Sequence, residues 1–327
     1  MEYKKPQATI IQGNVGIYPL TTADQVILAD GTRLEKDGKI NVDVANSADS
    51  AKLGGKAPEY YIQPRNLLDN SDFRNPVNQR EKTSYSGIWV YNIDRWAAWF
   101  NASNPATVTI DSGGITPYPG MIIQRIESKY IDSSKTYTLA AMTGDGLLVL
   151  SGKITSATQS TTNSNNGISF EYNAESDTYQ FVLYSSTSAS KFVWAALYEG
   201  SYTADTLPPY VPKGYAAELA ECQRYYYQSW TDSSPNTFNG VIICEAIVLS
   251  RATNVVFPQT MRISNPTVTL YSPATGNTGK ASEFVSNTEI DAGSVYLSRN
   301  GFTLGNTASA FEIGKHYCIH YSVSADL

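Results

Sequence analysis

The residues near the C-terminus that could carry metal or nucleophilic chemistry are His316, Cys318 and His320. If this segment is a strand, alternation places all three side chains on one face. Imidazoles and a thiolate bind metals such as zinc, so three copies of this strand meeting on a symmetry axis would form a metal site. Side chains two positions apart on a strand stand about 6.6 Å apart and do not converge within one chain. We therefore predict satisfied core or interface histidines and no metal site.

Carboxylates are the second candidate for chemistry, because glycoside hydrolysis needs only two of them at a suitable separation. The chain has 30 acidic residues, and sequence spacing does not give distances across a sandwich. We therefore assign no catalytic role to Asp94, Glu127 or Glu171. The oxygen-rich segment 69–72 could hold a calcium ion, but it lacks the spaced ligands and glycine of an EF-hand loop. We predict a turn whose side chains cap its own backbone.

The signatures of common enzymes are missing from the sequence. It contains neither a Gly-x-Ser-x-Gly elbow nor the glycine-rich loops that hold phosphates. With two histidines, both near the C-terminus, a Ser-His-Asp or Cys-His system would have to be built on one strand end. We predict a non-catalytic protein without a cofactor.

Aromatic side chains offer a different chemistry, which is recognition without reaction. The densest run is residues 89–100, with three tryptophans. Sugar rings stack their C–H faces on aromatic rings, while their hydroxyls bond with amides, carboxylates and arginines. We predict a carbohydrate-binding platform of Tyr85, Trp89, Tyr91 and Trp99. Burial in a core is the alternative for each ring, because large aromatics usually anchor cores.

The elements that position these residues are predicted to be strands. Of the 327 residues, 12% are aromatic and only 17% are charged, which favours strands over charged helices. Short apolar runs alternate with Gly, Asn, Ser and Pro turns from residue 89 to 210, and again from 240 to 323, as in β-sandwiches and jelly rolls. Helical spacing predicts one short helix over 215–229, lying against the second sandwich. The fold class is all-β.

Composition divides the chain into three parts. Residues 1–65 have too little apolar material for a core, so we expect an extended attachment arm or stalk that orders on another chain; a disordered linker is the alternative. Residues 66–212 form the predicted jelly-roll, carbohydrate-binding-like domain. Three prolines in 207–214 mark the boundary to a C-terminal β-sandwich tip domain, residues 213–327.

Charge and hydropathy exclude two classes of partner. The net charge of −6 provides no basic surface for phosphates, so we expect no nucleic acid. No window approaches the roughly 18 apolar residues of a membrane span, and no apolar signal core follows the first residues. We expect no membrane insertion. Cys222, Cys244 and Cys318 lack the short spacings of zinc or redox sites, which suits synthesis in a reducing compartment.

Several segments resemble a known family. Residues 48–61, ADSAKLGGKAPEYY, are similar to an AxxLGGKxPxYY element of phage tail-fibre stalks. Residues 66–73, 75–80 and 93–96 resemble the opening of jelly-roll, carbohydrate-binding-module-like domains of phage structural proteins, and 135–139 fits a KTYTL strand of such domains. Residues 218–226, 257–262, 265–268 and 321–327 look like the tip domain of the same proteins. The chain thus resembles bacteriophage or prophage tail-fibre and receptor-binding proteins, except that Arg80-Glu81 stands where relatives often carry Arg-Gly.

The resemblance implies a homotrimeric virion fibre, made in the bacterial host cytoplasm. Its N-terminal arm would bind other virion proteins, and its sugar sites would adhere to host cell-surface glycan without catalysis. Three weak sites on one trimer reach useful avidity through effective concentration. Two alternatives stay open: a purely structural virion protein, such as a head fibre or decoration protein, and a polysaccharide depolymerase with a carboxylate pair between subunits.

Overall fold

The computed structural model describes residues 64–99, 106–231, 234–306, 308 and 310–327, together with the backbone of four two-residue strands nearer the N-terminus. The chain divides into two units, Met1–Gln63 and Pro64–Leu327. In the first unit, β1 (Ile10–Ile11) pairs with β2 (Asn14–Val15), and β3 (Val26–Ile27) pairs with β4 (Arg33–Leu34). The rest of the predicted arm, up to residue 63, lies outside the described residues.

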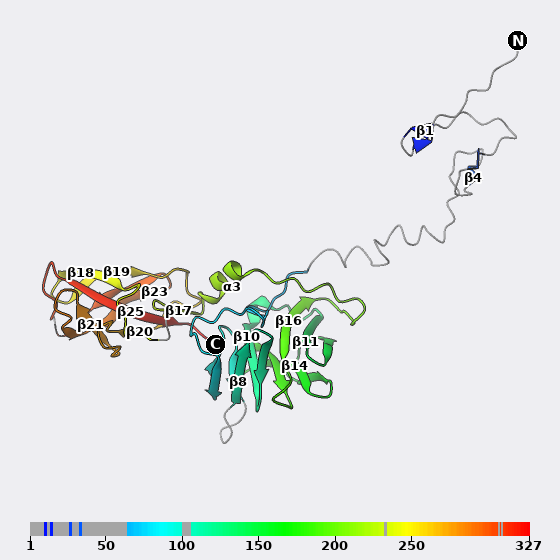
Figure 1. Ribbon diagram of the computed structural model, residues 1–327, viewed down its shortest axis with the longest axis horizontal. Coiled ribbons are helices and arrows are strands. Elements are labelled where there is room, and N and C mark those ends of the chain that lie inside the picture. Colours follow the sequence, from blue (N-terminus) through cyan, green and yellow to red (C-terminus); the bar gives the residue numbers. More distant parts are fainter. Residues whose placement is uncertain are drawn as a thin grey trace, which may run out of the picture. The chain divides into compact units, whose positions relative to one another are not determined.

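The first part of the second unit is a sandwich of two antiparallel sheets, each of six strands among the described residues (Figure 1). The β10 sheet has the order β13-β14-β15-β10-β7-β6, and the β11 sheet has the order β12-β11-β16-β9-β8-β5. A 3-10 turn, η1 (Ser128–Tyr130), follows β10. The strands are β5 (Ser84–Gly87), β6 (Val90–Tyr91), β7 (Ala97–Trp99), β8 (Ala106–Asp111), β9 (Gly114–Pro117), β10 (Met121–Glu127), β11 (Tyr137–Thr143), β12 (Gly146–Gly152), β13 (Gln159–Thr162), β14 (Asn166–Asn173), β15 (Thr178–Ser185) and β16 (Phe192–Glu199).

The core of this sandwich follows from strand alternation. On β10, Ile122 and Ile126 point into the core, while Arg125 lies on the opposite face. Trp96 is fully buried and packs edge-on against Phe73, with ring centroids 5.3 Å apart. Its indole N–H donates to the backbone oxygen of Asn70 at 3.0 Å, so the ring is buried without an unpaired donor.

The outer face of the β11 sheet is covered by the chain itself. Ala140, Ala196 and Tyr198 on this face form a second apolar cluster with Leu207. Trp194 on β16 stacks in parallel on Tyr210, with ring centroids 4.5 Å apart. The proline-containing segment 201–212 therefore supplies the apolar cover that an exposed sheet face would otherwise lack.

The helix α3 (Tyr215–Cys222) is shorter than predicted. After it, β17 (Tyr226–Gln228) pairs with the last strand of the chain, and this long-range pairing outweighs the helical spacing of the sequence. Glu218 on the buried face of α3 accepts a 2.7 Å hydrogen bond from the backbone N–H of Asn70. The helix therefore lies on the first sandwich, and the prediction that it lies against the second is wrong.

The C-terminal part is built around β25, and its sheet has nine strands among the described residues (Figure 1). The first half of β25 pairs with β18 and β21, and its second half pairs with β17 and β20. The apolar core contains Phe302, Tyr317, Ile319 and Tyr321. The strands after β17 are β18 (Ile242–Val248), β19 (Arg251–Val256), β20 (Thr267–Tyr271), β21 (Lys280–Glu283), β22 (Glu289–Asp291), β23 (Gly293–Ser298), β24 (Gly301–Gly305) and β25 (His316–Ser324).

These sheets confirm the predicted all-β class. Within the described ranges, no helix has both the length and the apolar composition required to cross a membrane.

A buried guanidinium joins the first sandwich to the end of β25. Arg80 Nη1 lies 2.7 Å from Asp94 Oδ1, and its Nη2 lies 2.9 Å from Asp326 Oδ2. The guanidinium carbon also lies 3.5 Å from the ring centroid of Tyr226. Burial outweighs the favourable charge of Arg80 and raises the pKa of Asp94 to about 6.

Asp94 should make the stability of the protein depend on pH. Its folded-state pKa of about 6 lies above the ordinary value of 3.8, so the folded chain holds an extra proton between these values and loses stability as pH rises through this window. Relative to the Asp94→Asn variant, the wild type should lose up to about 3 kcal/mol of unfolding free energy between pH 4 and pH 7. Urea unfolding of both proteins across this range measures the difference, and a constant difference would contradict the raised pKa.

Candidate functional site

Two of the four residues predicted for the platform lie together on the outer face of the β10 sheet. Trp89 is 41% exposed and Trp99 is half-buried. Their ring centroids lie 6.4 Å apart, with the planes inclined by 43°. The backbone N–H of Trp89 donates to the carbonyl oxygen of Ala98 at 2.7 Å, which fixes Trp89 beside Trp99 across the β6–β7 hairpin.

The other two predicted residues have structural partners. Tyr85 is 5% exposed in the sandwich core, and its hydroxyl donates to Asn78 Oδ1 at 2.9 Å. The hydroxyl of Tyr91 donates to the backbone oxygen of Leu327 at 2.7 Å and accepts from its N–H at 3.0 Å. Tyr85 therefore belongs to the core, whereas Tyr91 is half-buried and its hydroxyl is held by the C-terminal residue.

An arginine completes the exposed group. The guanidinium carbon of Arg125 lies 4.0 Å from the ring centroid of Trp89, a cation–π distance. Trp89 has a φ of 54°, a left-handed conformation that a bulky residue adopts only when its surroundings require it. Such backbone costs about 1–3 kcal/mol and occurs preferentially at ligand sites. Trp89, Trp99 and Arg125 are called the tryptophan platform below.

A third aromatic ring lies further along the same face. Strand register aligns Trp99 with Met121, Met121 with Tyr184, and Tyr184 with Gly167. A Cβ added to Gly167 would lie within 2.0–2.5 Å of ring atoms of Tyr184. The ring of Tyr184 therefore lies flat across Gly167, which has no side chain to lift it.

The next polar row on this face supplies hydrogen-bonding groups. Arg125, Gln180 and Glu171 are aligned by register on three neighbouring strands. When the Gln180 amide is oriented to accept, its oxygen lies 3.2 Å from both Nε and Nη2 of Arg125. Glu171 accepts a hydrogen bond from Thr158 Oγ1. The face thus combines apolar rings with a guanidinium, an amide and a carboxylate.

Sequence reasoning missed Arg125, Tyr184 and Gln180. They lie within residues 89–210, where short strands were predicted, and alternation would have shown that Arg125 and Ile126 face opposite ways. Strand register was the missing information, because it depends on which segments pair across the sheet.

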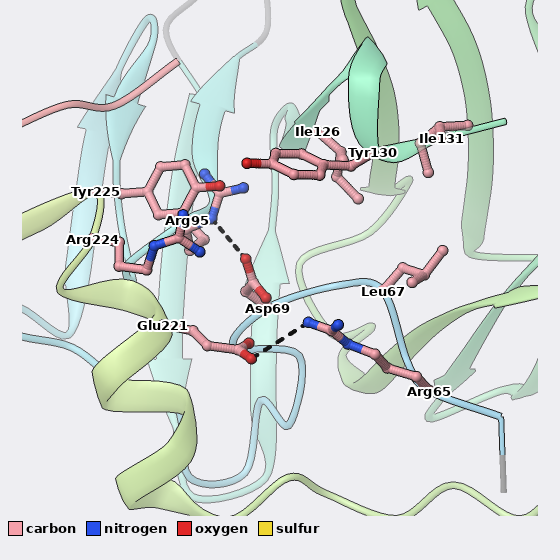
Figure 2. A pocket seen from close by; sticks show the side chains of 10 residues that line it. All are labelled: Arg65, Leu67, Asp69, Arg95, Ile126, Tyr130, Ile131, Glu221, Arg224 and Tyr225. Carbon is pink, nitrogen blue, oxygen red and sulfur yellow. Dashed lines mark hydrogen bonds and ion pairs between the residues drawn. The ribbon is translucent and has the colours of Figure 1, made fainter. Parts of the chain in front are cut away.

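A pocket of about 310 Å³ lies at one end of the first sandwich, next to the C-terminal end of α3 (Figure 2). At its base, Asp69 Oδ2 lies 3.1 Å from Arg95 Nε, and Asp69 Oδ1 lies 3.1 Å from Lys213 Nζ. Burial alone would raise the pKa of Asp69, but the two cations lower it to about 2. Asp69 is therefore ionised at neutral pH.

Among the described residues, one set of three acidic side chains lies close enough together to bind a metal ion. Asp69, Glu218 and Glu221 each bring a carboxylate oxygen within 4.8 Å of the others. Lys213 Nζ donates to Asp69 at 3.1 Å and to Glu221 at 2.7 Å, so an ammonium already supplies positive charge there. Burial raises the pKa of Glu218 to about 7, which weakens it as a metal ligand at neutral pH.

Most of the other predicted candidates for chemistry bind protein groups, whereas the side chain of His316 is exposed at the start of β25. In segment 69–72, Asp72 Oδ1 accepts from the backbone N–H of Arg74 two residues on at 3.3 Å, as in the predicted turn, whereas Asn70 Oδ1 accepts from the N–H of Val77 seven residues on at 2.7 Å. His320 is buried, with Nδ1 3.0 Å from Ser229 Oγ and Nε2 3.0 Å from the Thr237 oxygen. Of the three carboxylates considered, Asp94 pairs with Arg80, Glu127 pairs with Arg262, and Glu171 binds Thr158.

Gly167 should be required for the position of the Tyr184 ring. Gly167→Ala would push the ring off the sheet and should lower the free energy of unfolding by about 1–3 kcal/mol. Gly144→Ala is the matched control, because an added Cβ there meets no atom within 4 Å. Urea unfolding midpoints compare the two variants, and equal midpoints would show that Tyr184 does not depend on Gly167.

Comparison with protein-family models and with curated proteins finds no match for this chain.

Proposed function

We propose that this protein is a phage virion fibre or receptor-binding protein that holds host cell-surface glycan on the outer face of the β10 sheet without reacting with it. The observation that carries the proposal is the tryptophan platform, in which Trp89 and Trp99 lie 6.4 Å apart beside the guanidinium of Arg125. The resemblance of the sequence to phage fibre proteins supplies the biological setting.

The platform suits a pyranose ring for two reasons. The C–H face of the sugar is apolar and packs on indole rings, which release water when they are covered. The hydroxyls at the edge of the sugar need directional partners, and Arg125 and Glu171 lie on the same face, in one row with the buried Gln180 between them. Because the rings are only partly exposed and the face is open, we expect weak binding by each site.

Weak sites become useful when several act together, so the proposal includes a homotrimer. Exposed apolar side chains on the C-terminal sandwich support a contact between copies, because monomeric surfaces rarely carry large apolar patches. Ile247 on β18 is 56% exposed, and Val285 in the β21–β22 turn is 84% exposed. Ile243, Phe284 and Ile313 of the same sandwich are also exposed. The N-terminal arm would bind other virion proteins.

Trp89→Ala should reduce glycan binding at least tenfold, because loss of the central ring removes stacking and the support for Arg125. A glycan array on the purified full-length protein first identifies a ligand, and isothermal titration calorimetry then compares the variants. Tyr296→Ala is a matched control: Tyr296 is 66% exposed, has a φ of 50° and lies 4.8 Å from the Arg251 guanidinium carbon. An equal loss in both variants would contradict a specific role for Trp89.

The array and an assay of polysaccharide cleavage together separate the alternatives. No bound glycan together with normal trimer assembly would favour a purely structural virion protein. Release of reducing sugar from host polysaccharide, lost when one carboxylate is removed, would favour a depolymerase.

A trimer should depend on the apolar residues of the C-terminal sandwich. The double variant Ile247→Lys, Val285→Lys places charges there and should convert trimer to monomer at micromolar concentration. Val211→Lys is the control, because Val211 is 53% exposed on segment 201–212 of the first sandwich. Multi-angle light scattering measures the mass, and cell binding by the monomer should fall far below that of the trimer. A wild-type monomer would overturn the trimer and the avidity mechanism.

A further inference from the structure

We propose that the pocket beside α3 is a second binding site, which takes the carboxylate of an acidic sugar such as a hexuronate. The choice of a sugar as ligand rests on the proposed function, whereas the choice of an acid rests on the charges in the pocket. The tryptophan platform plays no part in this site.

The pocket combines a charged wall with an apolar wall. Figure 2 shows Arg65 and Arg224 reaching toward it from opposite sides, with Asp69 and Arg95 at its base. Its volume of about 310 Å³ lies at the lower end of the range for small-molecule sites. A single monosaccharide is therefore the largest unit that we expect to enter fully.

The positive charges of the pocket are not all neutralised. Asp69 is shared between Arg95 and Lys213, so it has no capacity left for a further cation. Glu221 pairs with Lys213, whose Nζ lies 2.7 Å from Oε2. Its other oxygen, Oε1, lies 3.7 Å from Nη2 of Arg65, and the side chain of Arg65 is 76% exposed. In the part of the chain that the structure describes, Arg224 has no ion pair. An incoming carboxylate would therefore find Arg224 unpaired and Arg65 only loosely held.

The apolar wall argues for an organic anion. Leu67, Ile126, Tyr130 and Ile131 line the side of the pocket away from α3, and Tyr130 is 53% exposed. An inorganic phosphate would leave these apolar side chains exposed to water, whereas the C–H face of a sugar would cover them. A hexuronate has both features, an apolar ring face and a carboxylate that guanidinium groups bind through charge-assisted hydrogen bonds.

The pocket and the platform are separate sites. Ile126 lines the pocket and Arg125 contacts Trp89, and these neighbours on β10 point to opposite faces of the sheet. Substitutions at Arg224, Tyr130 or Trp89 can therefore change one site without the other, whereas Arg95 lines the pocket and also donates to the backbone oxygen of Arg125 at 2.8 Å.

The test is calorimetric titration of the full chain with sodium glucuronate, glucose and inorganic phosphate. We expect one glucuronate per chain, with glucose and phosphate each at least tenfold weaker. Arg224→Gln should weaken glucuronate about tenfold, which corresponds to the loss of about 1.4 kcal/mol for one charge-assisted contact. Arg65→Gln should weaken it less, because Arg65 already has a partner. Tyr130→Ala should weaken glucuronate without changing phosphate.

Trp89→Ala makes the failure of this inference distinguishable from the failure of the proposed function. It should leave glucuronate binding unchanged while removing binding of the glycan found on the array. Unfolding midpoints of every variant show whether the fold is kept. Three results would overturn the second site: glucose binding as tightly as glucuronate, phosphate binding as tightly as glucuronate, or no loss with both arginines replaced in a folded chain.

Discussion

Two buried ion pairs on consecutive residues hold the turn between β6 and β7, and the candidate platform depends on them. Asp94 pairs with Arg80 at 2.7 Å, and Arg95 pairs with Asp69 at 3.1 Å. Arg95 holds a φ of 74°, which lets the two neighbouring side chains reach different segments. Removing one partner of a buried pair leaves an uncompensated charge, at a cost of about 3–5 kcal/mol. Trp89 and Trp99 lie at the open end of the hairpin that this turn closes, so charge burial in the turn positions the exposed rings.

The same pairs connect distant parts of the chain. Arg80 also binds Asp326 beyond β25, and the guanidinium carbon of Arg95 lies 3.4 Å from the ring centroid of Tyr225, which follows α3. The C-terminal sandwich and the helix are thus tied to the hairpin through two arginines. A guanidinium has five donors in a planar fork and stacks on aromatic rings, so it can satisfy several neighbours at once where a lysine cannot.

Local patterns in the sequence predicted short strands and the all-β class, because alternation and turn residues act within a few positions. The same patterns could not assign Tyr91, whose hydroxyl binds Leu327, 236 positions away. They also extended α3 too far, because β17 gains its partner from β25 near the end of the chain. Arg125 and Tyr184 join the candidate face only through register. What the sequence did not predict is therefore long-range pairing, which no local pattern encodes.

Aromatic rings on the two outer faces of the first sandwich differ in how far they are covered by the rest of the chain. On the β11 sheet, Trp194 is covered by Tyr210 from segment 201–212, and the stack belongs to the fold. On the β10 sheet, Trp89 keeps 41% of its surface exposed and is held in a left-handed backbone conformation beside a cation. A ring that served only packing would gain more by burial, at about 25 cal/mol per Å² of apolar surface. Tyr296 on β23 combines the same exposure, left-handed backbone and neighbouring guanidinium, so these features alone do not distinguish Trp89. What distinguishes Trp89 is the second indole beside it, because the ring centroid of Trp99 lies 6.4 Å away on the same face.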